Sequence, residues 1–500
     1  MNTFLPNIYH RFVTTGAEMA ARLFCGVLTL AALFLASPLA AQQFDGLSSA
    51  IEQGDFGNLK AVIVSQHGEI IYEDYFRGSQ ADDLHQVQSV TKSVGSALIG
   101  IAHRQGKIEL DQRLEYYFSD LYDLSQTAYQ GKADITVEHI LQQRHGVAWD
   151  EESTDYRNPQ NSARQMIESG DWYQYFLTRP MDAEPGEKFT YSSGASTLMS
   201  RLLRVSTGMA TEEFAMQELF APLEIDQVHW EVYSEDGPGT GLMQWPGPDH
   251  DVPLGFSLWL KARDMLKFGE LYLNGGVYNG QRILDQSWIE ASWTKYSNSE
   301  NSDYFPEPGW GHGYQWWIAN IDDTLGRSWD IFFASGWGSQ VIFVVPELDL
   351  VVVTTADNYN YNGPDVDALL LGWILPELNP VLDDRFTGSW YDPSTNGQGF
   401  SLQILEERNK PVGYWYTYTD TGDKRWFTIS GRLVDGIGQV NIRQPIGGIF
   451  LQDDLVTMDD WGTATIRPID CNHIEFEVES AEVSTIIPLT RLTGVCFMAP

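Results

Sequence analysis

The sequence predicts an α+β domain, in which an antiparallel sheet is flanked by helices, followed by a small all-β C-terminal domain. Two observations predict this arrangement. Before residue 380, strand-like runs stand at both ends of the chain with helical patterns between them, as in layered α+β domains. After the segment PELNPVLDDRFTG, helical periodicity disappears and short alternating runs replace it. We therefore expect a first domain over residues 42–380 and a second over 381–500.

The first domain is expected to begin with a β-hairpin, because the strand-like runs AVIVSQ and EIIYEDYF are joined by His67-Gly68. Helical patterns follow in SVTKSVGSALIGIA, ITVEHILQQ, SSGASTLMSRLL and WLKARDMLKFGELYLNGG. The last strand candidates are GYQWWIAN, SWDIFFAS and QVIFVVPELDLVVVTT. We expect the outer strands of the domain to meet in one antiparallel sheet.

The second domain is expected to be all-β. Its alternating runs are GFSLQIL, VGYWYTYT, RWFTISG, GQVNIR, TATIRPI, HIEFEVE and STIIPLTRL, and TDTGD is typical of a hairpin turn. The pattern GSWYDPSTNGQGFSLQIL resembles a β-domain appended to some secreted bacterial proteins, to which we attach no activity. Trp390, Trp415, Trp426 and Trp461 are open to two interpretations. Such aromatic residues more often fill a small β core, but they can also form a carbohydrate or cell-surface contact.

Residues 1–41 predict a secretory signal peptide, because Arg11 and Arg22 precede the apolar run LFCGVLTLAALFLA and small residues follow it. The apolar run is short for a spanning helix, which needs about 20 residues, so no stable membrane anchor is expected after cleavage. The protein is therefore expected to be exported, either periplasmic or secreted. Cys471 and Cys496 remain in the mature chain, and a pair of cysteines in an exported protein predicts one disulfide, with two free buried thiols as the alternative.

The charge of the chain excludes some classes of partner. The formal net charge is −37, and residues 1–41 contribute +1, so the mature chain lies near −38. Nucleic-acid binding needs a basic face, so no nucleic-acid partner is expected, and adhesion to anionic membranes is disfavoured. Strong acidity indicates solubility more than it names a partner.

Ser89 and Lys92 form an S-x-x-K pattern at the start of a predicted helix, so both side chains project from one helix face. A serine hydroxyl becomes a nucleophile when a base takes its proton, and a desolvated lysine can be that base. The bare pattern is more typical of an exposed Ser and Lys on an ordinary amphipathic helix. Here Val94, Leu98 and Ile101 continue an apolar face that would partly bury Lys92, and a buried unpaired lysine is costly. The segment therefore suggests a serine acyl-transfer enzyme.

Two further segments are candidates for the same site. Tyr191 precedes a predicted helix, and a tyrosine near a Ser-Lys pair can relay protons, with its phenolate favoured by a nearby cation. The alternative is a core tyrosine with a bonded hydroxyl. In FFASGWGSQ a strand ends at Ser335-Gly336, where a glycine lets another backbone approach and the N–H groups can stabilise an oxyanion. The alternative is a bulge or turn between two strands.

Together the three segments resemble the serine β-lactamase, DD-peptidase and class C-type esterase superfamily over about residues 55–375. YSSGAST and FASGWGSQ resemble the branch that includes 6-aminohexanoate-dimer hydrolases and related esterases. The resemblance implies that Ser89 is the acylated nucleophile, Lys92 its base and Tyr191 the proton shuttle to the leaving group. It implies an oxyanion hole formed by the backbone N–H groups of Ser89 and Trp337. It also implies a substrate cleft lined by Ser193, Ser335 and Gly336.

No cofactor or metal is expected, because the histidines form no H-E-x-x-H or other close pair, and the G-x-S-x-G elbow is also absent. Two departures from the β-lactamase pattern bear on substrate. Ala334 stands where β-lactamases carry Lys or His, and Ser193 stands where they carry Asn. Both changes favour a small neutral or cationic ester or amide over β-lactams and D-Ala-D-Ala peptides. The acidic loop over residues 150–156 either lines the cleft or is simply solvated.

These residues are compatible with three alternative functions. The first is an exported serine hydrolase that cleaves a small ester or amide. The second is a β-lactamase or DD-peptidase. The third is a non-catalytic binding protein on a hydrolase-like scaffold, against which the intact set of Ser89, Lys92 and Tyr191 argues.

Overall fold

The computed structural model describes residue 44 and residues 46–493, with gaps at 232, 235–236, 239–250, 299–308, 325, 360–362, 379, 406–407, 435, 449–455 and 471. The predicted signal segment and both cysteines of the predicted disulfide, Cys471 and Cys496, lie outside the described residues, so both remain predictions. Among the described residues, every helix is too short or too polar to cross a membrane.

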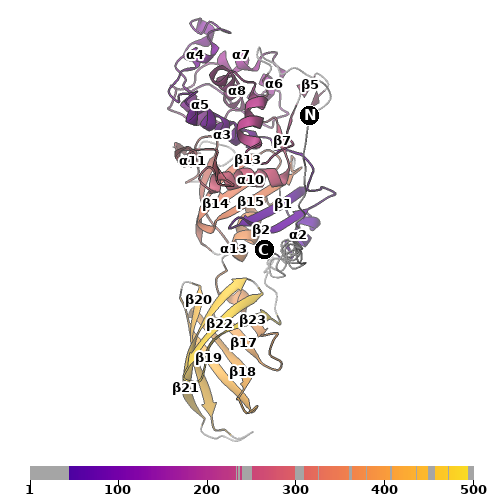
Figure 1. Cartoon of the computed structure of the whole chain (residues 1–500), viewed down its shortest axis with the longest axis vertical. Coiled ribbons are helices and arrows are strands. Elements are labelled where there is room, and N and C mark those ends of the chain that lie inside the picture. Colours follow the sequence, from indigo (N-terminus) through magenta and orange to yellow (C-terminus); the bar gives the residue numbers. More distant parts are fainter. Residues whose placement is uncertain are drawn as a thin grey trace, which may run out of the picture. The chain divides into compact units, whose positions relative to one another are not determined.

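The described part of the first domain is built on an antiparallel eight-stranded sheet (Figure 1). Its order is β10 (Ser297–Asn298), β11 (Gly311–His312), β12 (Trp317–Asp322), β13 (Ser328–Gly336), β14 (Gln340–Val345), β15 (Leu350–Ala356), β1 (Leu59–Gln66) and β2 (Glu69–Tyr75). β1 pairs with β15, with Val62 opposite Thr354, so the two ends of the domain meet inside one sheet as predicted. The α+β fold class is confirmed, and so is the all-β character of the C-terminal domain described below.

One strand prediction is wrong. The run QVIFVVPELDLVVVTT forms the two strands β14 and β15 instead of one. Pro346 begins a short 3₁₀ turn, and Asp349 adopts a left-handed φ of 49°, so the chain reverses between the two halves of the run. The β1–β2 hairpin was predicted correctly, and its turn has left-handed His67 and Gly68.

The helices of the first domain are α2 (Leu47–Gln53), α3 (Val90–Arg104), α4 (Leu114–Phe118), α5 (Val137–Leu141), α6 (Ser162–Glu168), α7 (Trp172–Leu177), α8 (Ser193–Thr207), α9 (Thr211–Ala215), α10 (Ala262–Leu273), α11 (Gln286–Ser292), α12 (Val366–Leu369) and α13 (Leu375–Leu378). Helices α3 and α10 pack on one face of the sheet, and α2, α12 and α13 contribute to the hydrophobic cluster on the other. Short strands pair as β3 (His85–Gln86), β7 (Leu258–Leu260) and β4 (His229–Trp230), as β5 (Tyr233–Ser234) with β6 (Gly237–Pro238), and as β8 (Val277–Tyr278) with β9 (Gln281–Arg282).

The alternation of side chains along β1 divides the core in two. Ile63 belongs to the hydrophobic cluster that contains α3, α8 and α10, whereas Val62 and Val64 belong to the cluster that contains α2, α12 and α13. Helix α10 lies close to the sheet, since a Cβ added at Gly269 would be 2.6 Å from Val351. The sheet is therefore the middle layer, and α3 and α8, which pack on each other, hold the candidate site on one side of it.

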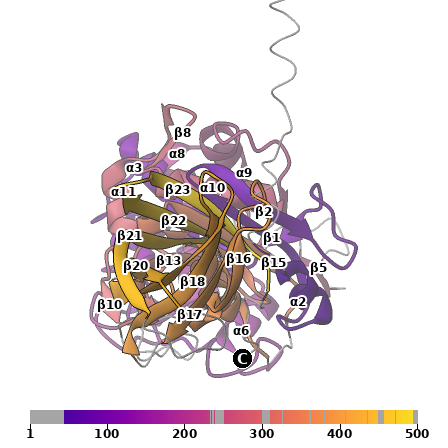
Figure 2. The same cartoon turned by 90° about the horizontal axis from the view of Figure 1, so that it is seen from below.

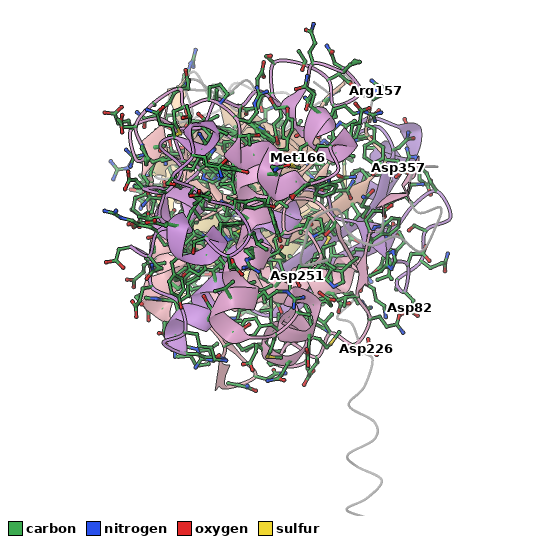
Figure 3. All side chains as sticks on the ribbon, turned by 90° about the horizontal axis from the view of Figure 1, so that it is seen from above. Asp82, Arg157, Met166, Asp226, Asp251 and Asp357 are labelled. Atoms are coloured by element: carbon green, nitrogen blue, oxygen red, sulfur yellow. The ribbon has the colours of Figure 1, made fainter. Side chains whose placement is uncertain are left out.

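An ion pair between Arg204 of α8 and the buried Asp251, which is labelled in Figure 3, fixes α8 within the helical layer. The Asp251 side chain is fully buried, and its carboxylate accepts a hydrogen bond from Arg204 Nη2 at 2.7 Å. It also accepts one from the backbone N–H of Thr211 at 3.2 Å, just where α9 begins. The pair thus ties the end of α8 to the start of α9.

The C-terminal domain is a closed antiparallel barrel of eight strands within the described residues (Figure 2). They are β16 (Gly388–Tyr391), β17 (Gly399–Leu405), β18 (Lys410–Tyr418), β19 (Lys424–Val434), β20 (Ile437–Ile446), β21 (Thr457–Asp470), β22 (His473–Ser480) and β23 (Ser484–Arg491). The core interpretation fits Trp390 and Trp415, which are buried, and Trp461, whose ring centroid lies 4.4 Å from that of Phe427. Trp426 differs, because it is exposed.

Candidate active site

The start of α3 brings Ser89 and Lys92 together. Ser89 occupies the N-cap position of the helix, and Lys92 follows one turn later, with its Nζ 2.9 Å from Ser89 Oγ. Gln88 adopts a left-handed φ of 49°, which turns the chain sharply into the helix. The geometry agrees with the spacing that the sequence predicted for this pair.

Lys92 is a buried lysine held by polar partners. It is 2% exposed, and its Nζ lies 3.0 Å from Ser193 Oγ and 2.8 Å from the carbonyl oxygen of Gly255, in addition to Ser89. Burial lowers the pKa of Lys92 to about 8, although the negative charge of nearby Glu151 acts in the opposite direction. The amine therefore loses its proton far more easily than an exposed lysine does.

Glu151 belongs to the acidic loop over residues 150–156, for which the sequence left open whether it lines the cleft or is solvated. The structure buries it behind Ser193. Its carboxylate accepts hydrogen bonds from Trp149 Nε1 at 2.6 Å, from the Ser193 N–H at 2.8 Å and from Ser193 Oγ at 2.8 Å. Gly194 permits this contact, since an added Cβ would lie 2.5 Å from the Trp149 ring. A loop with four acidic residues gave no signal that one particular carboxylate would be enclosed.

The hydrogen bonds around Lys92 have a defined direction. Ser193 has one hydroxyl proton and donates it to Glu151, so it can only accept from Lys92. The carbonyl of Gly255 can also only accept. A neutral amine has two protons, and these two acceptors use both. The lone pair is then left for the third neighbour, the hydroxyl of Ser89, whose proton it is placed to take.

Ser193 therefore does not lie where the resemblance implied. It was predicted to line the substrate cleft, but it is buried between Lys92 and Glu151 and is not part of the pocket wall. The reason is its place in the first turn of α8, which packs directly against α3.

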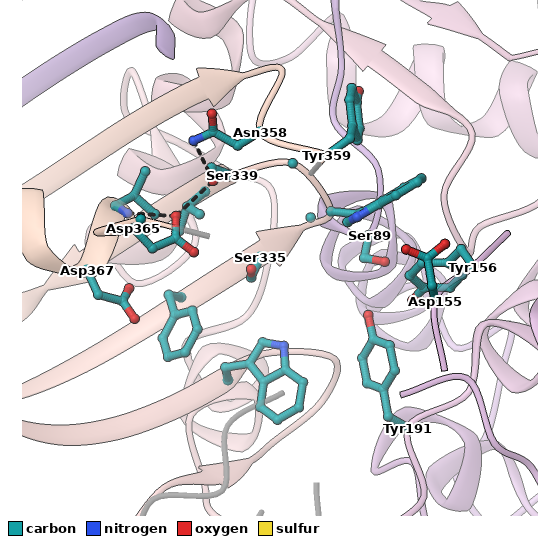
Figure 4. Close-up of a pocket in the computed structure, with 18 of the residues that line it drawn as sticks. Ser89, Asp155, Tyr156, Tyr191, Ser335, Ser339, Asn358, Tyr359, Asp365 and Asp367 are labelled. Carbon is teal, nitrogen blue, oxygen red and sulfur yellow. Dashed lines mark hydrogen bonds between the residues drawn. The ribbon is translucent and has the colours of Figure 1, made fainter. Parts of the chain in front are cut away.

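Tyr191 completes the group around the serine. Its hydroxyl is hydrogen-bonded to Ser89, its ring stacks on Trp317 with centroids 5.5 Å apart, and Lys92 Nζ lies 4.8 Å from its ring centroid (Figure 4). Burial, reinforced by the negative charge of Glu151, raises the pKa of Tyr191 well above its usual value. A cation does lie close by, as the phenolate interpretation required, but burial is the largest influence on the pKa of Tyr191 and favours the protonated form. In the resting site Tyr191 is a proton donor.

The end of β13 approaches the serine closely. A Cβ added at Gly336 would lie 2.3 Å from the carbonyl oxygen of Val87 and 3.1 Å from Ser89 N, so no side chain fits there. Ser335 and Gly336 line the pocket beside Ser89, as predicted for the cleft, and Trp337 continues its wall. The backbones of Ser89 and Trp337 thus border the same cavity, although their role as an oxyanion hole stays a prediction.

The pocket in front of Ser89 has a volume of about 540 Å³ and is partly aromatic (Figure 4). The Trp337 ring contacts those of Tyr156 and Tyr359, with centroids 5.3 Å and 4.9 Å away. Asp365 and Asp367 lie on the opposite side from Tyr191, and Asp365 accepts a hydrogen bond from Ser339 Oγ at 2.8 Å. In the described residues no group of three or more His, Cys, Asp or Glu side chains gathers as a metal site would require.

Comparisons with known proteins agree with this geometry. Residues 42–372 match the model of the family described as Beta-lactamase. The 6-aminohexanoate-dimer hydrolase of Paenarthrobacter ureafaciens is 25% identical over 343 residues, which cover 65% of this chain and 78% of that protein.

Two solved structures share the fold. A putative 6-aminohexanoate-dimer hydrolase from Bacillus anthracis has a TM-score of 0.53 and 19% identity, covering 66% of this chain and 81% of that one. A family VIII carboxylesterase has a TM-score of 0.50 and 16% identity, covering 68% and 98%.

Proposed function

This chain belongs to the β-lactamase family, and on that premise we propose that it is a serine hydrolase that cleaves a small neutral or cationic ester or amide through an acyl-enzyme on Ser89. The family includes amidases and esterases, which supports hydrolysis as the reaction class. The single observation that carries the proposal is the buried Lys92, whose Nζ lies 2.9 Å from Ser89 Oγ and whose other neighbours use up its protons.

In the proposed acylation, Ser89 Oγ attacks the carbonyl carbon of the substrate while its proton passes to Lys92 Nζ. The N–H groups of Ser89 and Trp337 stabilise the oxyanion that forms. When the bond to the leaving group breaks, Tyr191 gives its hydroxyl proton to the departing oxygen or nitrogen and regains one from the Lys92 ammonium. The negative charge of Glu151 stabilises that ammonium while it exists.

In the proposed deacylation the same groups act in reverse. Tyr191 and Lys92 take a proton from water as it attacks the acyl carbon, and the proton returns to Ser89 Oγ when the ester bond breaks. The enzyme thus ends in its starting protonation state, with one water consumed.

The substrate proposal rests on the walls of the pocket. Ala334, at the position where β-lactamases carry Lys or His, is buried in the hydrophobic core, so this position offers no cation to a substrate carboxylate. Arg157 lines the pocket, but its guanidinium is engaged by Asp155 at 2.7 Å. The rest of the wall combines aromatic rings with small and polar residues, and its charged groups there are the carboxylates of Asp365 and Asp367, which suit neutral or cationic groups better than anions. This argues against the β-lactamase or DD-peptidase alternative.

We also propose that the protein is exported, periplasmic or secreted, on the strength of its arginine-flanked apolar N-terminal segment. The intact mass of the protein recovered from its natural host distinguishes removal of residues 1–41 from their retention.

The function is tested by intact-mass spectrometry after incubation with a fluorophosphonate probe. We expect a single adduct on the wild type and none on Ser89→Ala, followed by turnover of p-nitrophenyl esters and little or none of nitrocefin. If the folded wild-type protein forms no adduct with the probe, the catalytic proposal is wrong and the binding-protein alternative is favoured. Nitrocefin turnover comparable to that of the esters would favour the β-lactamase alternative.

A further inference from the structure

The outer wall of the C-terminal barrel has a row of exposed aromatic rings. Tyr414, Tyr416 and Tyr418 alternate along β18, and Trp426 lies opposite Tyr416 on β19. These four side chains, here called the aromatic row, are 46%, 51%, 42% and 44% exposed. The Tyr414 centroid lies 6.4 Å from that of Tyr416 and 6.1 Å from that of Trp426, so these three rings form one continuous surface, and Tyr418 extends the row along β18. A core function does not explain them, because the intervening Trp415 points inward.

A groove of about 810 Å³ lies on the same barrel and is lined almost entirely by polar residues. This polar groove is bordered by Lys410, Ser430, Gly431, Arg432, Gln439, Val440, Asn441, Thr463, Ala464, Thr465, Glu477 and Glu479. Lys410 has the same parity on β18 as the three tyrosines, and Ser430 has the same parity on β19 as Trp426. Residues of one parity share one face of a strand, so the aromatic row and the polar groove belong to one outer surface.

The polar groove has unused hydrogen-bonding capacity. Within the described residues, no other residue forms a hydrogen bond with the side chains of Ser430, Gln439, Asn441, Thr463 and Thr465. Its charges are mixed, since its lining includes Lys410 and Arg432 as well as Glu477 and Glu479, and Glu477 forms an ion pair with Arg467. Amides, hydroxyls and opposite charges in one groove match a ligand that is rich in hydroxyls and carries no net charge.

We propose that this surface binds a neutral glycan chain, with sugar rings stacked on the aromatic row and their hydroxyls bonded in the polar groove. The C–H groups on one face of a sugar ring are slightly positive and are attracted to the negative face of an aromatic ring. Alternate residues on a strand are about 6.6 Å apart, a spacing comparable to the length of one sugar ring. The net charge of −37 opposes polyanionic chains, which leaves neutral glycans as the matching class.

The test uses the full-length mature protein in native gels that contain hydroxyethylcellulose, glucomannan or laminarin, with alginate as the polyanionic control. We expect at least one neutral polysaccharide to retard the wild type and Ser89→Ala equally. Trp426→Ala and Tyr414→Ala should each weaken binding about tenfold or more, and Asn441→Ala should weaken it less. Tyr116→Ala removes a 60% exposed tyrosine from the first domain and should leave binding unchanged.

Circular dichroism and urea unfolding establish that each variant, Ser89→Ala included, is folded. Retardation by none of the neutral polysaccharides, retardation by alginate alone, or unchanged binding by folded Trp426→Ala would each overturn the proposal. Because Ser89→Ala is expected to keep glycan binding, this result is independent of the proposed hydrolase function.

Discussion

Glu151 holds Ser193 through two hydrogen bonds, from the backbone N–H and from Oγ, both at 2.8 Å. The first bond fixes the serine in place at the start of α8. The second commits its only hydroxyl proton, so the oxygen presents lone pairs to Lys92. The Glu151 carboxylate does not line the pocket, but through Ser193 it determines how the protons and the lone pair of the Lys92 amine are oriented.

Glu151→Gln is expected to lower kcat by about 10- to 100-fold, because an amide cannot accept from both Ser193 donors, and the lysine loses its orientation. The charge of Glu151 raises the pKa of Lys92, so its removal should shift the acidic limb of the pH profile of kcat/KM to lower pH. Rate measurements from pH 5 to 10 check both effects. Asp150→Asn, in the same loop but exposed, is the matched control and should leave the limb in place. An unshifted limb in Glu151→Gln would contradict the assigned coupling.

The activity of the wild type should rise with pH and level off above an apparent pKa near 8, because Lys92 must lose its proton before it can accept one from Ser89. Lys92→Arg should lose about 1,000-fold or more in kcat/KM, since a guanidinium stays protonated at every accessible pH. Both are measured with a p-nitrophenyl ester, corrected for its spontaneous hydrolysis. A flat profile between pH 6 and 9 would rule out Lys92 as the titrating base.

Gly336→Ala should reduce kcat/KM by about 100-fold, because its methyl group would push β13 away from Val87 and Ser89 and misplace the reacting groups. The same overpacking should cost about 1–3 kcal/mol in the free energy of unfolding. Urea unfolding and ester hydrolysis are the two measurements. Gly170→Ala is the control, since an added Cβ there meets nothing within 4 Å. Equal activity in the two variants would mean that the close approach is not needed.

Asp251→Ala should destabilise the first domain by about 3 kcal/mol, because it leaves Arg204 and the N–H of Thr211 without their buried acceptor. Asp82→Ala removes a 93% exposed carboxylate from its pair with Lys261 and should cost less than about 1 kcal/mol. Thermal unfolding of the two variants at pH 7 compares the two sites, whose aspartates are both labelled in Figure 3. Similar melting temperatures would show that the buried pair contributes little.

Local patterns in the sequence were sufficient for much of the fold and for part of the site. The β1–β2 hairpin, α3 and α8 were predicted because each has a clear period and a turn or cap at its end. Ser89 and Lys92 were paired from their spacing, Tyr191 was joined to them by the family resemblance, and the structure places the three in contact.

Other features depend on neighbours that are remote in sequence. Glu151 was one of several acids in a loop, and only its contact with Ser193, 42 positions later, separates it from the rest. The run YWYTYT has aromatic residues at successive positions, so its pattern does not reveal which ring faces outward. The barrel register decides that Trp415 is buried and that Tyr414 and Tyr416 are exposed. The reversal at Asp349 did have a local signal, because Pro346, Glu347 and Asp349 interrupt the apolar residues of this run.

The pairing of β1 with β15 also constrains the order in which the first domain can fold during translation. The N–H of Asn58 donates to Asn358 Oδ1 across 300 positions of sequence, so the early hairpin gains its second neighbour only after most of the domain has been translated. Contacts between such distant segments slow folding, because a long loop must close before they form. The nascent chain therefore carries apolar strands that stay uncovered until residue 356 is free of the ribosome. No fragment that stops short of β15 can complete the central sheet.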